Sequence, residues 1–126
     1  MNAVFTCVQV HPGDASCLGK AAVRCDGEAG KIVAAESKFA LAINKKCSAV
    51  PFGTLAAAGG LDLGGLGGVC TAVGVGPVAS LASYQECVRR SHACEAASVL
   101  AAAAPRAGEM LLQVQRRLFE SFCPAP

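Results

Sequence analysis

Eight cysteines are the residues whose type and spacing could carry chemistry in this sequence. They are spread along the whole chain, at Cys7, Cys17, Cys25, Cys47, Cys70, Cys87, Cys94 and Cys123. An even, dispersed set is typical of a disulfide framework in an oxidising compartment, whereas metal sites use close pairs such as C-x-x-C. Because the tightest spacing here is Cys87 to Cys94, we expect about four disulfides and no metal site. A thiol-based metal binder in a reducing cell is the competing interpretation.

Residues in catalytic patterns are sparse. Only His11 and His92 could act as imidazole bases, and neither belongs to a recognisable nucleophile–base pattern. The even number of cysteines also argues that no unpaired thiol is left as a nucleophile. We therefore expect no catalytic residues, no enzymatic activity and no cofactor.

Composition and charge restrict the partners. The chain is 53 % apolar and 16 % charged, which fits a folded domain, and its formal net charge of +2 is too small to indicate nucleic acid. The pairs Arg89-Arg90 and Arg116-Arg117 are expected on solvated helix faces. With five Phe, one Tyr and no Trp, the core must use smaller side chains, so disulfides are expected to add stability.

Two segments carry the strongest helical signals. The stretch KIVAAESKFALAINKKC, residues 31–47, is rich in helix formers and has Lys45 and Lys46 near its end, where the helix dipole favours cations. Gly27 and Gly30 leave open whether residues 17–47 form one kinked helix or two. Ser83 and Glu86 match a capping box that would begin a second helix.

The helical wheel places cysteines on the expected buried face. At about 100° per residue, one stripe within about 80° contains Cys25, Ile32, Phe39, Ile43 and Cys47, and Glu36 falls near it. We expect an all-α fold, a small helical bundle or helical-hairpin array, in a single domain over residues 1–126. An irregular N-terminal arm is expected over residues 1–15, and a Gly-rich apolar segment over 48–79.

Paired bridges can join two helices that each carry spaced cysteines. The predicted pairs are Cys17 with Cys94, Cys25 with Cys87, Cys47 with Cys70 and Cys7 with Cys123. The first two follow from similar separations along two antiparallel helices. The third would close the Gly-rich segment, and the fourth would tie the termini together. Many other connectivities of eight cysteines are open.

The segment FGTLAAAGGLDLGGLGGVC, residues 52–70, contains seven glycines and one charge. It lacks the Lys of a phosphate-binding P-loop and the spacing of a Rossmann turn. Residues 63–85 are uncharged and long enough to span a bilayer, but the many glycines and Pro77 disfavour a stable membrane span. Gly60, Gly64 and Gly68 recur every four residues, and we expect them to pack a helix closely against the core or another subunit.

Three stretches carry a resemblance to a group of proteins: CDGEAGKIVAAESKFALAINKKC, ECVRRSHAC and APRAGEMLLQV. They resemble uncharacterised cysteine-rich secreted helical proteins of bacteria, which implies export and a helical, disulfide-bonded module. The first residues, MNAVFTCVQVHPGDASC, lack the charged and apolar regions of a signal peptide.

The sequence thus favours a non-catalytic structural or interaction module, secreted or periplasmic. A homo-oligomer or another protein is the expected partner. The main alternative is a carrier of a lipid or other apolar small molecule, because a core of small residues held by disulfides can leave a cavity.

Overall fold

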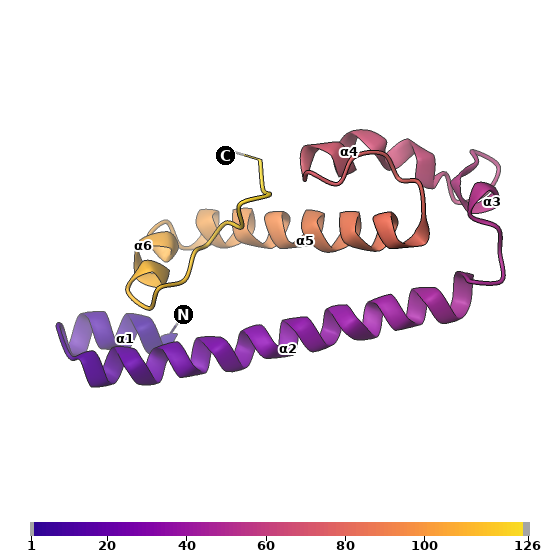
Figure 1. Ribbon diagram of the computed structural model, residues 1–126. Coiled ribbons are helices and arrows are strands. Elements are labelled where there is room, and N and C mark those ends of the chain that lie inside the picture. The colour runs from indigo at the N-terminus through magenta and orange to yellow at the C-terminus, as the bar shows by residue number, and fades with distance from the viewer. Residues whose placement is uncertain (1, 125–126) are drawn as a thin grey trace. The chain divides into compact units, whose positions relative to one another are not determined.

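The computed structural model describes residues 2–124 (Figure 1). Within them the chain is helical and contains no strand, which confirms the all-α, disulfide-stapled fold. The elements are α1 (Asn2–Val10), α2 (Ala15–Cys47), α3 (Phe52–Ala56), a 3-10 helix η1 (Leu63–Leu66), α4 (Gly67–Ala72), α5 (Leu81–Ala103) and α6 (Ala107–Leu112).

The chain, expected to form one domain, is organised in two compact units. Unit 1 comprises the residues up to Ala34 together with Ala97–Phe119, and unit 2 comprises Ala35–Ala96 with the residues from Glu120 onward. The long helices α2 and α5 contribute residues to both units. Each unit has its own cluster of buried side chains.

Unit 1 is built on a hairpin of α1 and the first turns of α2. Val4, Cys7, Ala21 and Val114 form its core, and Cys7 is bonded to Cys17 with their Cα atoms 5.6 Å apart. The prediction of an irregular arm over residues 1–15 is therefore wrong, because residues 2–10 are helical. Pro12 and Gly13 make only the turn that follows, where Gly13 adopts a φ of +81°.

Asp14 fixes the start of α2. Its Oδ1 accepts hydrogen bonds from the backbone N–H groups of Ser16 and Cys17, at 2.8 and 3.1 Å. These bonds satisfy two of the donors that a helix leaves unpaired at its N-terminus. The bond from Cys17 is the main reason that the pKa of Asp14 is lowered from its ordinary value of 3.8.

Helix α2 runs without interruption through Gly27 and Gly30, which answers the question of one helix or two. Its apolar residues do not form the expected buried stripe. Ile32 is 61 % exposed, and Phe39, Ile43, Cys25 and Cys47 are only half-buried. Ala21 is the one buried residue in the 33 residues of this helix.

Unit 2 packs short helices against the first half of α5. Its core consists of Leu55 of α3, Leu63 of η1, Val78, and Cys70 of α4 bonded to Cys87 of α5. Gln85 ties this half of α5 to α2, because its amide donates to Asn44 Oδ1 at 2.9 Å and to the Ala40 carbonyl at 3.3 Å.

The Gly-rich segment folds into turns and short helices, so Gly60, Gly64 and Gly68 do not share one helix face. A Cβ atom on Gly60 would lie 2.0 Å from the Thr54 carbonyl oxygen, and one on Gly64 would lie 3.1 Å from that of Ala56. Gly68 has open space around it. The first two glycines therefore allow close packing within unit 2, against α3.

The disulfide pairing differs from the predicted one at every bridge. The structure pairs Cys7 with Cys17, Cys70 with Cys87 and Cys94 with Cys123, and it leaves Cys25 and Cys47 free. The prediction failed because the partners of the two helices are the segments that fold back on them: α1, α4 and the C-terminal segment. There are thus three bridges, where about four were expected.

Candidate functional site

A network of charged side chains on α5 joins this helix to two other segments of unit 2. Glu86, Arg89 and Arg90 are spaced i, i+3 and i+4, so they lie on one side of the helix. The start of α5 sets their position: Ser80 and Ser83 form a reciprocal cap, with Ser83 N donating to Ser80 Oγ at 3.1 Å and Ser80 N donating to Ser83 Oγ at 2.9 Å.

The cap changes the role expected for Glu86. Ser83 and Glu86 were predicted to form the capping box, but Ser83 pairs with Ser80 instead. The helix begins at Leu81, which leaves Glu86 in its second turn. The Glu86 carboxylate is therefore free to bind the two arginines that follow it.

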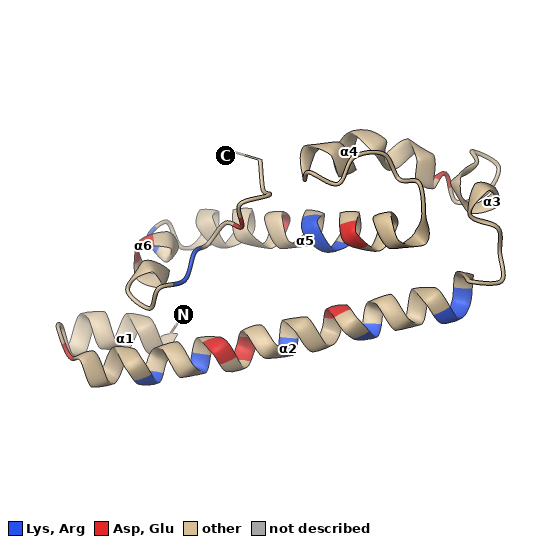
Figure 2. Ribbon diagram, in the orientation of Figure 1, with Lys and Arg blue, Asp and Glu red and all other residues tan. Residues whose placement is uncertain are grey.

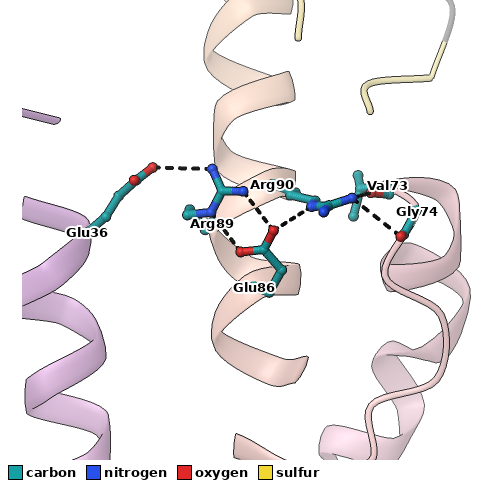
Figure 3. A network of polar contacts seen from close by, with 6 residues as sticks. All are labelled: Glu36, Val73, Gly74, Glu86, Arg89 and Arg90. Atoms are coloured by element: carbon teal, nitrogen blue, oxygen red, sulfur yellow. Dashed lines mark hydrogen bonds and ion pairs between the residues drawn. The ribbon is translucent and has the colours of Figure 1, made fainter. Parts of the chain in front are cut away.

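Glu86 receives three hydrogen bonds from arginines (Figure 3). Arg89 donates to both of its oxygens, at 2.8 and 2.7 Å, and Arg90 Nε donates to Oε1 at 2.6 Å. These bonds, those from Arg89 first, lower the pKa of Glu86 from 4.5 to about 2. Glu86 in turn raises the pKa of Arg89.

The network continues to two further segments of unit 2. Arg89 Nη1 lies 3.7 Å from Glu36 Oε1 of α2. Arg90 Nη1 donates to the carbonyl oxygens of Val73 and Gly74, at 3.1 and 3.3 Å, just after α4 ends (Figure 3). Cations are favoured at this end of a helix, where the last carbonyls lack partners.

Phe122 lies against both arginines. The guanidinium carbons of Arg89 and Arg90 are 5.5 and 4.9 Å from the centre of its ring, within the range of cation–π attraction. The neighbouring Cys123 is bonded to Cys94, four residues after Arg90 on α5. Residues 122–123 are therefore fastened to α5 by one covalent bond and two ring contacts.

The network suits a structural role better than ligand binding. Two carboxylates and two guanidinium groups balance one another, and the side chains of Glu36, Glu86, Arg89 and Arg90 are 26–37 % exposed. The prediction that Arg89 and Arg90 lie on a solvated face is therefore wrong. The pattern Glu-x-x-Arg-Arg was the available sequence signal, but it does not reveal the contacts with Glu36, Val73 or Phe122.

The two histidines lie outside this network. His11 is exposed in the turn before α2. His92 is 75 % exposed on its side chain, and its Nδ1 lies 3.6 Å from Glu95 Oε2. Ser91 is the described residue whose buried side-chain hydroxyl has no hydrogen-bond partner.

Two thiols are free, those of Cys25 and Cys47, so the expectation that the even number of cysteines leaves no unpaired thiol is wrong. Both are half-buried, with Cys25 packed on the core of unit 1 and Cys47 on the core of unit 2. Six of the eight cysteines are in disulfides and cannot supply thiolates. Within residues 2–124, no three His, Cys, Asp or Glu side chains are grouped so that they could hold a metal ion.

No helix among the described residues has both the length and the apolar character that crossing a membrane requires. Comparison of the chain with family models, with curated proteins and with solved structures finds no match. The resemblance to cysteine-rich secreted helical proteins of bacteria therefore stays a prediction.

Proposed function

We propose that the protein is a non-catalytic interaction module of an oxidising compartment that associates with further copies of itself through helix α2. The observation that carries this proposal is the exposure of α2. Of its 33 residues only Ala21 is buried, while Val23, Ile32 and Leu41 are 61–72 % exposed. Long helices gain most of their stability by packing an apolar face against a neighbour.

The exposed side chains of α2 lie on more than one side of the helix. Val23 and Ile32 are nine residues apart, which at about 100° per residue puts them on opposite sides. One flat neighbour cannot cover both. Contacts on two sides are what an assembly of several copies supplies, and the net charge of +2 opposes such association only weakly.

Three disulfides support an oxidising compartment, extracellular or periplasmic, because thiols are kept reduced in most cytosols. The absence of catalysis is proposed on the character of the Glu86 network. Its charges are paired with one another and with backbone carbonyls, so no group in it is left to act as a base or nucleophile.

Sedimentation velocity over a wide range of protein concentration tests the proposal. The wild-type protein should show a rising average mass, and Val23→Ser/Ile32→Ser should weaken association about tenfold or more because it removes apolar contact area. A matched control is Val10→Ser/Leu112→Ser, which changes two residues of unit 1 that are equally exposed, at 63 and 61 %, but lie outside α2.

Circular dichroism should show unchanged helix content in both variants, since all four side chains face solvent. A wild-type protein that stays monomeric at the highest concentration would overturn self-association. Equal weakening by the two double variants would show that α2 is not the surface involved.

A further inference from the structure

Unit 1 contains an open groove of about 430 Å³ between α1 and the first turns of α2. Its apolar lining includes Ala3 of α1, Ala21 of α2 and the Cys7–Cys17 bridge. Thr6 also lines it, but the Thr6 hydroxyl already donates to the Asn2 carbonyl at 3.0 Å. The volume falls within the roughly 300–1,000 Å³ typical of small-molecule sites.

Two cations complete the lining, Lys20 and Arg24. They are four residues apart on α2, so their side chains lie one turn apart on the same side of the helix. Figure 2 shows Lys and Arg positions along α2 in blue. No carboxylate lines the groove, and within residues 2–124 neither cation has a carboxylate oxygen within ion-pair distance.

The carboxylates nearest in sequence are engaged elsewhere. Asp14 accepts from the backbone at the start of α2, Glu28 pairs with Lys31 at 2.7 Å, and Asp26 pairs with Arg116. Lys20 attracts the carboxylate of Asp14, and Arg24 attracts that of Glu28, over longer distances. Each attraction makes a small contribution to lowering the pKa of that carboxyl group.

The two units carry equal numbers of charged residues but differ in net charge. Unit 1 has six Lys and Arg against four Asp and Glu, and unit 2 has five of each, so the formal net charge of +2 belongs to unit 1. The fourth carboxylate of unit 1, Glu109, pairs with Arg106 at 2.9 Å. Among the described residues, three cations of unit 1 have no carboxylate within ion-pair distance, namely Lys20, Arg24 and Arg117, and of these Lys20 and Arg24 line the groove.

We infer that this groove binds a single-chain amphiphile with an anionic headgroup, of the fatty-acid type. The headgroup carboxylate lies between Lys20 and Arg24, where it accepts charge-assisted hydrogen bonds. The alkyl chain lies along Ala3, Cys17 and the aliphatic stems of Lys20 and Arg24, whose surfaces are still open to water, and covering them favours binding. The inference does not rest on self-association, because ligand binding to the monomer is measured separately.

Sodium decanoate, below its micelle concentration, is the probe. Titration followed by amide NMR should give saturable shifts in α1 and in residues 17–24, and Lys20→Gln/Arg24→Gln should weaken binding about tenfold or more. The matched control is Lys45→Gln/Lys46→Gln, which removes the same charge from the other end of α2. It should change the dissociation constant by less than about twofold, because screening limits distant charges.

Three further ligands distinguish the contribution of the charged headgroup from that of the alkyl chain. Decyl maltoside has the same chain with a neutral head, acetate has the head without the chain, and vesicles of anionic lipid present the charge on a surface. Decanoate should bind more tightly than either small molecule and should bind without vesicles. Equal affinity for decyl maltoside, equal affinity for acetate, binding to vesicles alone, or equal weakening by the two glutamine variants would each overturn the inference.

Discussion

At the scale of single residues, Glu86 must stay ionised to hold Arg89 and Arg90. Its pKa is lowered from 4.5 to about 2, mainly by the hydrogen bonds from Arg89. A carboxylate with a lowered folded-state pKa contributes stability that is fully present above about pH 4.5. That stability is lost as the pH falls through the folded pKa near 2.

We expect the free energy of unfolding of unit 2 to fall between about pH 4.5 and pH 2. The Glu86 side chain is 37 % exposed, so screening by solvent reduces the contribution to about 1 kcal/mol. Urea unfolding followed by the fluorescence of Tyr84 measures it, because the chain has one Tyr and no Trp and Tyr84 packs on the core of unit 2.

Other carboxyl groups also contribute to the pH dependence of unfolding, so the contribution of Glu86 is identified by comparing variants. Glu86→Gln should lose the corresponding part of the pH dependence. Glu95→Gln should keep it, since the Glu95 side chain is 73 % exposed on the same helix. Identical pH profiles for wild type and Glu86→Gln would contradict the role given to the network.

Substitution by Ala should lower the free energy of unfolding at Gly60 and raise it at Gly68. Gly60→Ala puts a Cβ atom 2.0 Å from the Thr54 carbonyl oxygen, which forces the backbone to move and should cost about 1–3 kcal/mol. Gly68 is inside α4 with open space around it, so Gly68→Ala should stabilise by about 0.5–1 kcal/mol. Urea unfolding at neutral pH, with Tyr84 as the probe, compares the two.

These glycines show what residue patterns could and could not predict. Their four-residue spacing predicted a shared helix face, which is not formed, although Gly60 and Gly64 do lie close to the backbone of α3. It did not reveal that the backbone turns between them, because three equally spaced glycines fit a helix, a turn or a loop. The contacts of Arg90 with Phe122 and Val73 could not be predicted either, because those residues are distant from it in sequence.

At the scale of elements, the disulfides differ in how well the packing of helices protects them. Cys70 and Cys87, which join α4 to α5, are 0 and 2 % exposed. The other two bridges each contain one half-buried cysteine, Cys17 or Cys123. Thiol–disulfide exchange requires access of the attacking thiolate to a sulfur atom.

Under native conditions a small amount of thiol reductant should therefore open Cys7–Cys17 and Cys94–Cys123 before Cys70–Cys87. Alkylation at intervals, followed by peptide mass mapping, gives the order. Full reduction should add six hydrogen atoms to the intact mass, as three bridges require. Early loss of the Cys70–Cys87 bridge would show that the core of unit 2 opens more readily than its burial indicates.

Helix positions were more predictable than helix partners. Composition and spacing indicated α2 and α5. Gly27 and Gly30 left open whether α2 is continuous, and it is, because each glycine costs a helix only about 1 kcal/mol. Helix α1 was missed because Asn2–Val10 is short and has no charged residue. It is held by Val4 and Cys7, which are 0 and 4 % exposed, and that contact depends on the turn bringing it back onto α2.

At the scale of the whole molecule, the two separate cores should let each unit open locally without the other. Val4→Ala removes two methyl groups from a fully buried position in unit 1 and should cost about 2 kcal/mol there. Amide hydrogen exchange should then speed up in residues 2–34 and 97–119. Exchange in α3 and α4 of unit 2 should stay close to that of the wild type.

The matched variant is Val78→Ala, which changes the same residue type in the core of unit 2. It should produce the opposite distribution, with faster exchange in α3 and α4. Equal acceleration in both units by either variant would show that the chain unfolds as one cooperative body.

The short loop closed by Cys7 and Cys17 also affects how cleavage is detected. Residues 9–16 are all exposed around the turn, and Asp14 is the one acidic residue among them. An endoprotease that cuts before Asp can sever the backbone there, yet the bridge joins the two pieces across the cut. A nicked molecule would gain one water and migrate as intact protein on a gel until a reductant separates its fragments.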